Sequence, residues 1–332
     1  MASSTAAQTE KCKLALIAEW ALRAEQYRPV IDGTINGQKI GILLDTGAAQ
    51  SLIQRSATTR LGLTRYEAKG YRIFGVGGEV PADFVLVDEF RIGEAARRNW
   101  RVLVSGEHDF SGDIAVFLGD DFFNQVDIEF DLAHHAVRLY ETKDCEAASL
   151  AYWTTEPAGV VPIETGQKIW LTIAINGKPV RAELDSGAGY SVLSRADAAG
   201  LGVTPESLGV VAGGCVTGLG KRQMDSWIGL FESFAIGNEI IRNPRIRFAD
   251  LWQYTTYTET GSRLPTRVAG QPDMLLGADF LRAHRVLIAR SQRKMYFTHA
   301  GGTVFPIKPS KGCNYASPGD PRPDPLPKQG DR

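Results

Sequence analysis

Residues 42–48 read ILLDTGA, and residues 182–188 read AELDSGA. In each stretch a mostly apolar, strand-like run ends at an aspartate, which a hydroxyl residue and a glycine follow at once. A carboxylate at the end of an apolar strand is normally unfavourable in a protein core. The presence of two such carboxylates, one in each half of the chain, predicts that Asp45 and Asp185 face each other in the folded protein.

The two stretches lie within a longer internal repeat. An Asn-Gly pair comes before each aspartate at the same spacing, and Leu61–Leu63 matches Leu201–Val203 at the same offset of 140 residues. Further pairs follow at offsets of 143, 144 and 158 residues: Gly75–Gly77 with Gly218–Gly220, Phe90–Gly93 with Phe234–Gly237, and Val116–Phe122 with Met274–Phe280. The largest insertion lies between Trp252 and Asp273. Because chance does not easily produce such collinear matches, we predict two homologous lobes in one chain.

The composition narrows the classes of function. A chain of 332 residues with 43% apolar and 23% charged residues is typical of a globular protein with room for two domains. The net charge of −1 gives no attraction to nucleic acid, so no nucleic-acid partner is expected. No apolar run approaches the ~20 residues that span a bilayer. Residues 1–8 have no basic and apolar signal-peptide regions, which is compatible with a periplasmic or secreted protein after signal cleavage and with a cytosolic start.

Four cysteines occur, at positions 12, 145, 215 and 313. None has the CxxC or CxxH spacing of a zinc site, so no metal is expected. Cys12 and Cys145 bracket the first lobe, which makes a bridge between them conceivable. The even count is compatible with two disulfides and equally with buried free thiols.

Turn signals such as Asn-Gly and Gly-Gly separate short runs rich in Val, Ile, Phe, Leu and Tyr. Many runs alternate apolar with polar residues, as half-buried strands do. This pattern predicts an all-β fold of two β-barrel lobes with few short helices. Strands are expected at residues 39–44, 82–90, 126–130, 169–175 and 228–236. Helices are expected at residues 54–61, 121–126, 195–201 and 279–284, with Asp121 and Asp279 as helix caps.

The chain is expected to divide into four parts. Residues 1–25 form an N-terminal segment, either a strand of the first lobe or a prosegment lying in the cleft. Residues 26–147 and 148–309 form the two lobes. Residues 310–332 hold five prolines and almost no apolar residues, so this tail is expected to be disordered.

Two carboxyl groups in contact suit the hydrolysis of a peptide bond. The ionised carboxylate takes a proton from water, and the protonated one polarises the carbonyl oxygen. Because like charges a few ångströms apart do not both ionise easily, the pair splits into a low and a high apparent pKa. Gly47 and Gly187 let the backbone approach the carboxylates and donate N–H bonds. Thr46 and Ser186 can hydrogen-bond the opposite loop.

On these residues the sequence resembles the aspartic peptidases, nearest to bacterial retropepsin-like proteins. The family's motif is apolar-apolar-Asp-Thr/Ser-Gly-Ala, here Leu43–Ala48 and Glu183–Ala188, where Glu183 departs from the apolar preference. The second signature, apolar-apolar-Gly, is matched by Phe117–Gly119 and Leu275–Gly277. Residues similar to a flap tip lie between the signatures: they are Phe74, Gly75, Val76, Gly77 and Gly78 in the first lobe and Gly218, Leu219 and Gly220 in the second.

The resemblance covers about residues 26–309 and implies two pseudo-twofold-related acid-protease lobes in one chain, as in pepsins. It implies an aspartic endopeptidase in which Asp45 and Asp185 activate a water molecule, with no metal or organic cofactor. A protein or peptide substrate would lie extended between the aspartates and the flap, and a monomer is expected. The alternative is a catalytically silent peptide-binding module on the same fold.

One departure from the pepsin-like pattern bears on pH. Pepsin-like enzymes usually carry Ser or Thr after the motif glycine, and that hydroxyl bonds an outer oxygen of the aspartate pair. Ala48 and Ala188 take these two positions here. Because losing a hydrogen bond to the charged form raises the pKa of a carboxyl group, we predict a mildly acidic optimum.

The remaining candidates have weaker patterns. Tyr71 precedes the flap and suits substrate contact or strand packing. The insertion holds Trp252, Tyr254 and Tyr257, which are expected to line the cleft or to cover a barrel end. The five histidines show no metal or triad spacing, and surface positions are expected for all of them: His108, His134, His135, His284 and His299.

Overall fold

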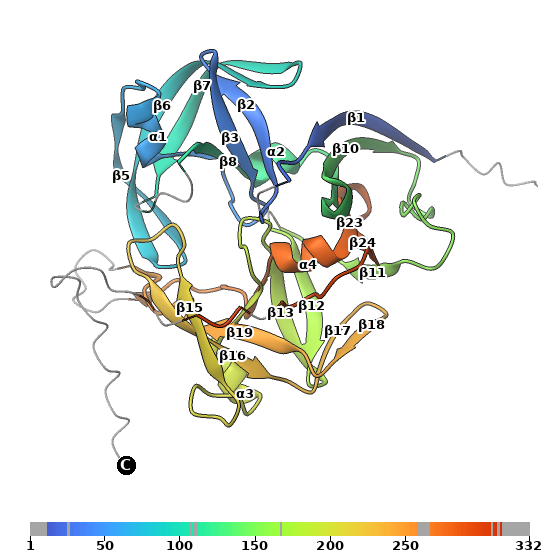
Figure 1. The fold of residues 1–332 in the computed structure, drawn as a ribbon. Helices are drawn as coiled ribbons and strands as arrows, with labels where there is room; N and C mark the ends of the chain where they lie inside the picture. Colours follow the sequence, from blue (N-terminus) through green and yellow to red (C-terminus); the bar gives the residue numbers. More distant parts are fainter. Residues whose placement is uncertain are drawn as a thin grey trace, which may run out of the picture.

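The computed structural model describes residues 12–24, 27–106, 108, 112–166, 168–257, 266–306, 308–310 and 313. Most of them lie in strands, and the α-helices among them have four to six residues, so the predicted all-β fold is confirmed. Figure 1 shows a blue and cyan lobe above a yellow and orange lobe, with further strands beside them that come from both. The tail predicted to be disordered lies almost entirely outside the described residues.

The first lobe is a seven-stranded sheet that curls back on itself, because β2 pairs with both β3 and β6. Helix α1 (Arg55–Arg60) follows β4 directly. The strand order is β2 (Val30–Ile35), β3 (Gln38–Leu44), β8 (Ile114–Leu118), β4 (Leu52–Gln54), β7 (Ala95–Ser105), β6 (Gly78–Ile92) and β5 (Tyr66–Gly75).

The second lobe repeats this arrangement in a nine-stranded sheet. β13 runs parallel to β22 as β3 does to β8, and β14 runs parallel to β19 as β4 does to β7. Helix α3 (Arg195–Gly200) corresponds to α1, and β20 (Thr256–Tyr257) pairs with β21 (Thr266–Arg267) in the insertion. The strand order is β15 (Val211–Val216), β16 (Met224–Leu230), β19 (Arg245–Ala249), β14 (Val192–Ser194), β22 (Met274–Leu276), β13 (Lys178–Leu184), β12 (Trp170–Ile175), β17 (Ser233–Ile236) and β18 (Glu239–Arg242).

Three strands from each half of the chain form a shared six-stranded sheet. β9 and β23 pair at its centre, and β1 pairs with β10 at one edge. The N-terminal stretch is therefore a strand of this sheet over Lys13–Ala21. The strand order is β1 (Lys13–Ala21), β10 (Ala136–Lys143), β9 (Asp127–Asp131), β23 (His284–Ala289), β24 (Lys294–His299) and β11 (Gly159–Pro162).

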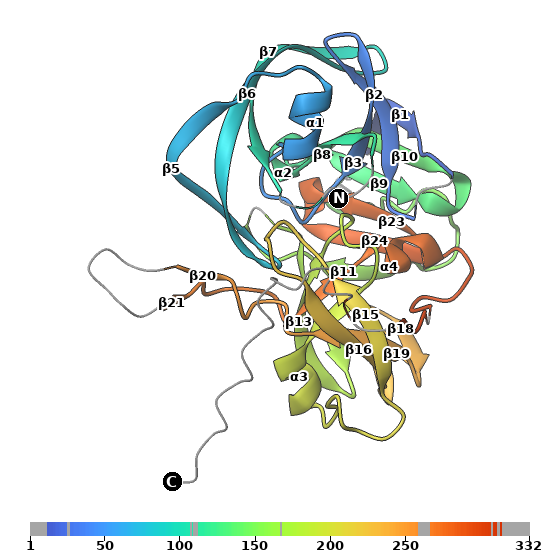
Figure 2. The same cartoon turned by 60° about the vertical axis from the view of Figure 1, so that its left-hand side comes forward.

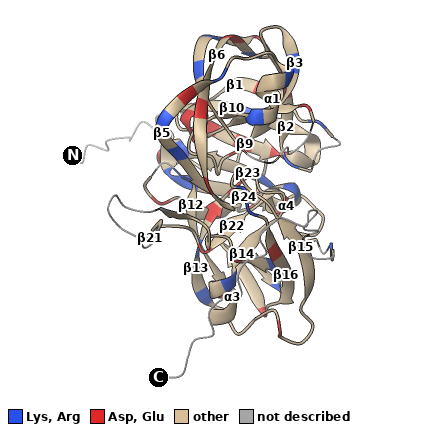
Figure 3. Cartoon of the chain, turned by 90° about the vertical axis from the view of Figure 1, so that its left-hand side faces the viewer, with Lys and Arg blue, Asp and Glu red and all other residues tan. Residues whose placement is uncertain are grey.

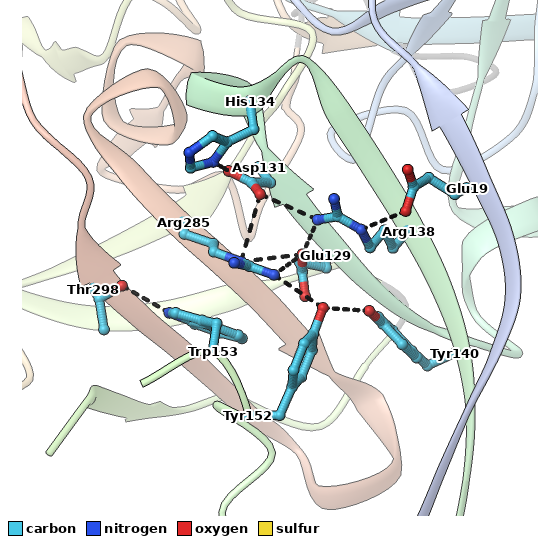
Figure 4. Close-up of polar contacts among 10 residues, drawn as sticks. All are labelled: Glu19, Glu129, Asp131, His134, Arg138, Tyr140, Tyr152, Trp153, Arg285 and Thr298. Carbon is cyan, nitrogen blue, oxygen red and sulfur yellow. Dashed lines mark hydrogen bonds and ion pairs between the residues drawn. The ribbon is translucent and has the colours of Figure 1, made fainter. Parts of the chain in front are cut away.

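Charged side chains cross the centre of the shared sheet. The carboxylate of Glu129 is fully buried and accepts hydrogen bonds from Arg138 at 2.6 Å and from Arg285 at 2.9 Å (Figure 4). Asp131 accepts further bonds from Arg138 and from His134. Because Arg138 belongs to the first half of the chain and Arg285 to the second, Glu129 links the two halves. Two guanidinium groups around one buried carboxylate offset the free-energy cost of its burial.

Both pairs of cysteines form disulfides, so the alternative of free thiols is wrong. Cys12 is bonded to Cys145, which ties the start of β1 to the segment after β10. Cys215 is bonded to Cys313, which ties the end of β15 to the C-terminal segment. Within the part of the chain that the structure describes, no helix has the length and apolarity needed to cross a membrane. Figure 3 shows basic and acidic residues interspersed over both lobes.

Two expectations about local structure are corrected. The strand expected at residues 228–236 is two strands, β16 and β17, because the chain turns where Glu232 donates its N–H to Asn176 Oδ1 at 2.8 Å. The surface position expected for His284 is wrong. Its side chain is fully buried, stacks on Phe280 and hydrogen-bonds Glu239.

Candidate active site

The two aspartates occupy equivalent places at the ends of β3 and β13. Asp45 donates its backbone N–H to Leu118 O at 2.9 Å, and Asp185 donates its N–H to Leu276 O at the same distance. Leu118 and Leu276 belong to the apolar-apolar-Gly signatures on β8 and β22. In each lobe, the apolar-apolar-Gly segment therefore holds the aspartate in place at the end of its strand.

The two motif loops pack directly on each other's carboxyl groups. A β-carbon built on Gly47 would lie 2.5 Å from Cγ of Asp185, and one built on Gly187 would lie 2.5 Å from Cγ of Asp45. Only glycine fits at so close an approach. The side chain of Asp185 also hydrogen-bonds that of Asp45. The structure thus brings together two side chains that lie 140 positions apart in the sequence.

Thr46 and Ser186 lock the two loops together by four reciprocal hydrogen bonds. The N–H of Thr46 donates to Ser186 Oγ at 2.9 Å, and the N–H of Ser186 donates to Thr46 Oγ1 at 3.0 Å. The Thr46 hydroxyl donates to Leu184 O at 2.7 Å, and the Ser186 hydroxyl donates to Leu44 O at 2.6 Å. All four bonds are buried, so they fix the geometry of the aspartate pair rigidly.

Each aspartate is also bonded within its own loop. Asp45 Oδ1 accepts N–H bonds from Gly47 at 3.1 Å and Ala48 at 3.2 Å, and Asp185 Oδ1 accepts the equivalent bonds at 2.9 and 3.1 Å. Burial raises the pKa of Asp45 well above its ordinary value, and the charge and hydrogen bond of Asp185 raise it further. The two N–H bonds oppose this shift without cancelling it. The protonated form of Asp45 is therefore favoured more than that of an ordinary aspartate.

Asp121 and Asp279 are not helix caps as predicted. The helices α2 (Asp120–Phe123) and α4 (Ala278–Ala283) begin after Gly119 and Gly277 and have no side-chain cap. Instead, Asp121 Oδ1 accepts bonds from the N–H and the hydroxyl of Ser51, both at 2.7 Å. In the second lobe, Asp279 holds Ser191 in the same way.

These aspartate–serine pairs hold the apolar-apolar-Gly segments beside the two motif aspartates. Ser51 Oγ accepts the N–H of Gly119 at 3.0 Å, and Ser191 Oγ accepts that of Gly277 at 2.9 Å. Burial raises the pKa of Asp279 to about 6, although the bonds from Ser191 oppose it. The signal for this role is in the internal repeat, because both the serine and the aspartate recur in the second lobe.

The two predicted flap tips meet above the aspartates. Gly220 donates its N–H to Val76 O at 3.0 Å, and Arg222 donates its N–H to Gly77 O at 3.2 Å. Figure 2 shows the β5–β6 hairpin reaching down to the β15–β16 hairpin of the other lobe. Val76 packs against the apolar residues of the second lobe, whereas Leu219 packs against those of the first. Each flap therefore covers the opposite half of the cleft.

The insertion of the second lobe contacts the first flap. The hydroxyl of Thr255 donates to Gly75 O at 3.0 Å, and the backbone of Tyr254 lies against Gly78. Trp252 lines the cleft, and its indole N–H donates to Pro272 O at 2.9 Å. The side chain of Tyr257 lies outside the described residues.

A cleft of about 1220 Å³ lies between the aspartates and the flaps. Five of the eight predicted flap residues line it, namely Phe74, Gly75, Val76, Gly218 and Leu219, whereas Gly77, Gly78 and Gly220 are not among its lining residues. Tyr71 lines it as well, and its hydroxyl donates to Gln50 Oε1 at 3.2 Å. His108 also lines the cleft, where a surface position was expected. Among the described residues, no group of three His, Cys, Asp or Glu side chains is placed to hold a metal ion.

Basic side chains beside the aspartates were missed by the sequence analysis. Arg28 is half-buried, lines the cleft and donates to Gly187 O at 3.3 Å. Burial lowers the pKa of Arg28, and the negative charges of Asp45 and Asp185 raise it, so all three groups interact electrostatically. In the second lobe, Lys168 binds the buried carboxylate of Glu183 at 2.7 Å. Burial raises the pKa of Glu183 from 4.5 to about 7, while Lys168 opposes this shift.

Comparison with known proteins gives matches in both lobes. The chain matches the family described as "Aspartyl protease" over residues 31–122 and 171–280, together more than half of its length. Among solved structures, it is similar to a retropepsin-like aspartic protease from Rickettsia conorii. The two are 18% identical, with a TM-score of 0.27, and the match covers 40% of this chain and 97% of that one. No curated protein is significantly similar to this chain.

Each of the two family matches contains one Asp-hydroxyl-Gly motif and one apolar-apolar-Gly signature. The repeated lobes and their strand order agree with this assignment. The chain therefore belongs to the aspartyl protease family.

Proposed function

We propose that the protein is an aspartic endopeptidase in which Asp45 and Asp185 form the catalytic dyad. The observation that carries this proposal is the reciprocal packing of Gly47 and Gly187 on the opposite carboxyl groups. This packing leaves two carboxyls in hydrogen-bonding contact at the floor of the cleft. A pair of this kind shares one proton, so one member acts as a base and the other as an acid.

The proposed reaction uses both protonation states at once. The ionised carboxylate removes a proton from a water molecule that attacks the peptide carbonyl carbon. The protonated carboxyl donates to the carbonyl oxygen, and the tetrahedral species then collapses with proton transfer to the leaving amine. The lock made by Thr46 and Ser186 keeps both carboxyls in place, so little reorganisation accompanies the reaction.

A mildly acidic optimum follows from the environment of the dyad. Activity requires one proton on the pair, so the rate falls above the higher apparent pKa and below the lower one. Burial and the charge of Asp185 raise the pKa of Asp45, which moves the upper limit toward neutral pH. No hydroxyl at positions 48 and 188 stabilises the ionised form, so the lower limit is not pushed toward strongly acidic pH.

The two flaps and the single chain support an extended peptide as substrate. A segment between the floor and the flaps would bond to the backbone of both hairpins. One chain supplies both aspartates and both flaps, so we propose that a monomer is sufficient. The two disulfides support a periplasmic or secreted location, because such bonds persist in oxidising compartments.

Cleavage of an unstructured protein between pH 4 and 7 tests the proposed function. The wild type should cleave it, a statine-type inhibitor should block cleavage, and Asp45→Asn should lower kcat by about 100- to 10,000-fold while the protein stays folded. A kcat of Asp45→Asn close to that of the wild type would defeat the dyad assignment. A catalytically silent peptide-binding module would bind the inhibitor without cleaving any peptide.

A further inference from the structure

The two halves of the cleft differ in polarity at equivalent positions. On β7, Leu103 lies beside Leu52, and on β19 the matching partner of Val192 is Arg247. Leu103 packs into an apolar cluster with Leu43, Leu52 and Phe117. At this pair of equivalent positions the wall of the cleft is therefore apolar in the first half, whereas it carries a guanidinium group in the second half.

Arg247 belongs to a basic corner assembled from four separate segments of the chain. The rings of Tyr27 and Tyr190 pack against each other with their centroids 5.1 Å apart and their planes tilted by 34°. The guanidinium of Arg247 lies 5.0 Å from the ring of Tyr190, and the ammonium of Lys308 lies 5.5 Å from the ring of Tyr27. Arg28 follows Tyr27 directly. The cleft that holds the aspartates is lined by Arg28, Tyr190, Arg247 and Lys308, whereas Tyr27 is not among its lining residues.

The carboxylate that interacts with Arg247 is bound by other donors. Asp279, which interacts electrostatically with Arg247, directs its oxygens to the N–H and hydroxyl of Ser191. Arg247 itself donates to Gly213 O and to Ser226 Oγ. Its Nε is buried and has no hydrogen-bond partner among the described residues. A buried cationic donor of this kind lowers the free energy of an anion bound beside it.

We propose that this basic corner, formed by Arg28, Arg247 and Lys308, is a subsite for an acidic side chain of the substrate. The proposal rests on the proposed endopeptidase function and names its substrate class. Peptides with Asp or Glu at one position near the scissile bond should be preferred, with an apolar side chain in the opposite half of the cleft. Tyr190 holds Arg247 in place, and Tyr27 holds Lys308, by cation–π contact.

Matched peptides test this subsite. A peptide cleaved by the full-length protein is varied to Glu, Gln and Lys at each of the three positions on either side of the scissile bond. At pH 6, where a glutamate is ionised, one position should favour Glu over Gln by about tenfold in kcat/KM, and Lys should be poorest there. Because the contact is ionic, the preference should weaken at high salt.

Two variants assign the preference to the corner. Arg247→Met should bring the Glu-to-Gln ratio close to one, and Lys308→Glu, at an exposed position, should lower it without disturbing folding. Arg242→Met is the matched control, because Arg242 is exposed on β18 and does not line the cleft. Cleavage with equal rates for Glu and Gln at every position would overturn the subsite and leave the endopeptidase standing. Failure to cleave any peptide would overturn both.

Discussion

The two lobes make nearly the same hydrogen bonds at the catalytic aspartates, but their residues differ two positions earlier in the sequence. Leu43 precedes Asp45, whereas Glu183 precedes Asp185 at the same position of the repeat. Arg28 and Lys168 also occupy equivalent positions in the two lobes. The backbone carbonyl of the next residue accepts an N–H bond of 2.9 Å in both cases, from Leu44 at the end of β3 and from Leu184 at the end of β13. The geometry of the motif is therefore shared, while the charges around it differ between the lobes. Duplication retained the hydrogen bonds that hold the carboxyls and let the surrounding electrostatics change.

The largest expected effect tests the part that the lobes share. Asp45→Asn and Asp185→Asn should each lower kcat by about 100- to 10,000-fold, because either change removes one of the two proton-transfer roles. Peptide cleavage measured across pH 4–7 checks this. Asp32→Asn, at an exposed position on β2, is the control and should keep full activity. A large difference between the two dyad variants would show that the lobes are not equivalent in the reaction.

The disulfides offer a second comparison between the lobes. Cys12→Ser with Cys145→Ser should lower the free energy of unfolding by about 3 kcal/mol, because that bridge joins positions 133 residues apart and fixes β1. Cys215→Ser with Cys313→Ser should cost less, since the C-terminal segment can detach locally without unfolding the lobe. Urea unfolding without reductant measures both values. Equal losses would mean that the C-terminal segment is as much a part of the cooperative unit as β1.

Lys168 provides a test of the charges that the lobes do not share. Lys168→Met should lower the free energy of unfolding by about 2 kcal/mol at pH 8, because it leaves the buried carboxylate of Glu183 without its ammonium. The pKa of Glu183 is raised to about 7 in the folded protein, so its contribution to stability is fully present below its ordinary pKa of 4.5 and is lost as pH rises toward 7. At pH 4 the group is protonated with or without Lys168, and the variant should be nearly as stable as the wild type.

A double substitution sharpens this comparison. Lys168→Met combined with Glu183→Leu gives the second lobe the same residue that the first has at Leu43. Well-packed apolar residues often replace a buried ion pair without loss, so the double variant should recover most of the stability at pH 8. Lys178→Met, on the exposed end of β13, is the control. An equal loss at pH 4 and pH 8 would contradict the role assigned to the ion pair.

The parts of the site that could be predicted are those with distinctive residues repeated in both lobes. Asp-Thr-Gly and Asp-Ser-Gly, with their second signatures, carry enough chemistry to be recognised at a fixed offset. The role of Asp121 and Asp279 was misread because an aspartate at a helix start has the pattern of a cap. Only the structure shows that each aspartate bonds the serine of a distant loop.

Other features could not be predicted because they depend on segments that meet only in the folded protein. The contact between Val76 and Gly220 joins two hairpins, and neither turn predicts by itself that it meets the other. The corner made by Arg28, Arg247 and Lys308 joins a linker, a strand and the C-terminal segment, none of which has a motif. Isolated basic residues have no periodicity that distinguishes a cleft position from a surface one.

The smallest expected effect returns to the position after each motif glycine. Ala48→Ser and Ala188→Ser each place a hydroxyl where it can donate to an ionised dyad carboxylate. Such a bond stabilises the charged form and lowers its pKa, so the acidic limb of the kcat profile should move down by about 0.5 pH unit in each variant. The limb should stay in place for Ala95→Ser, an exposed position at the start of β7. A shift toward higher pH would contradict the predicted effect. Unequal shifts in the two variants would show that the charge difference between Leu43 and Glu183 reaches the dyad itself.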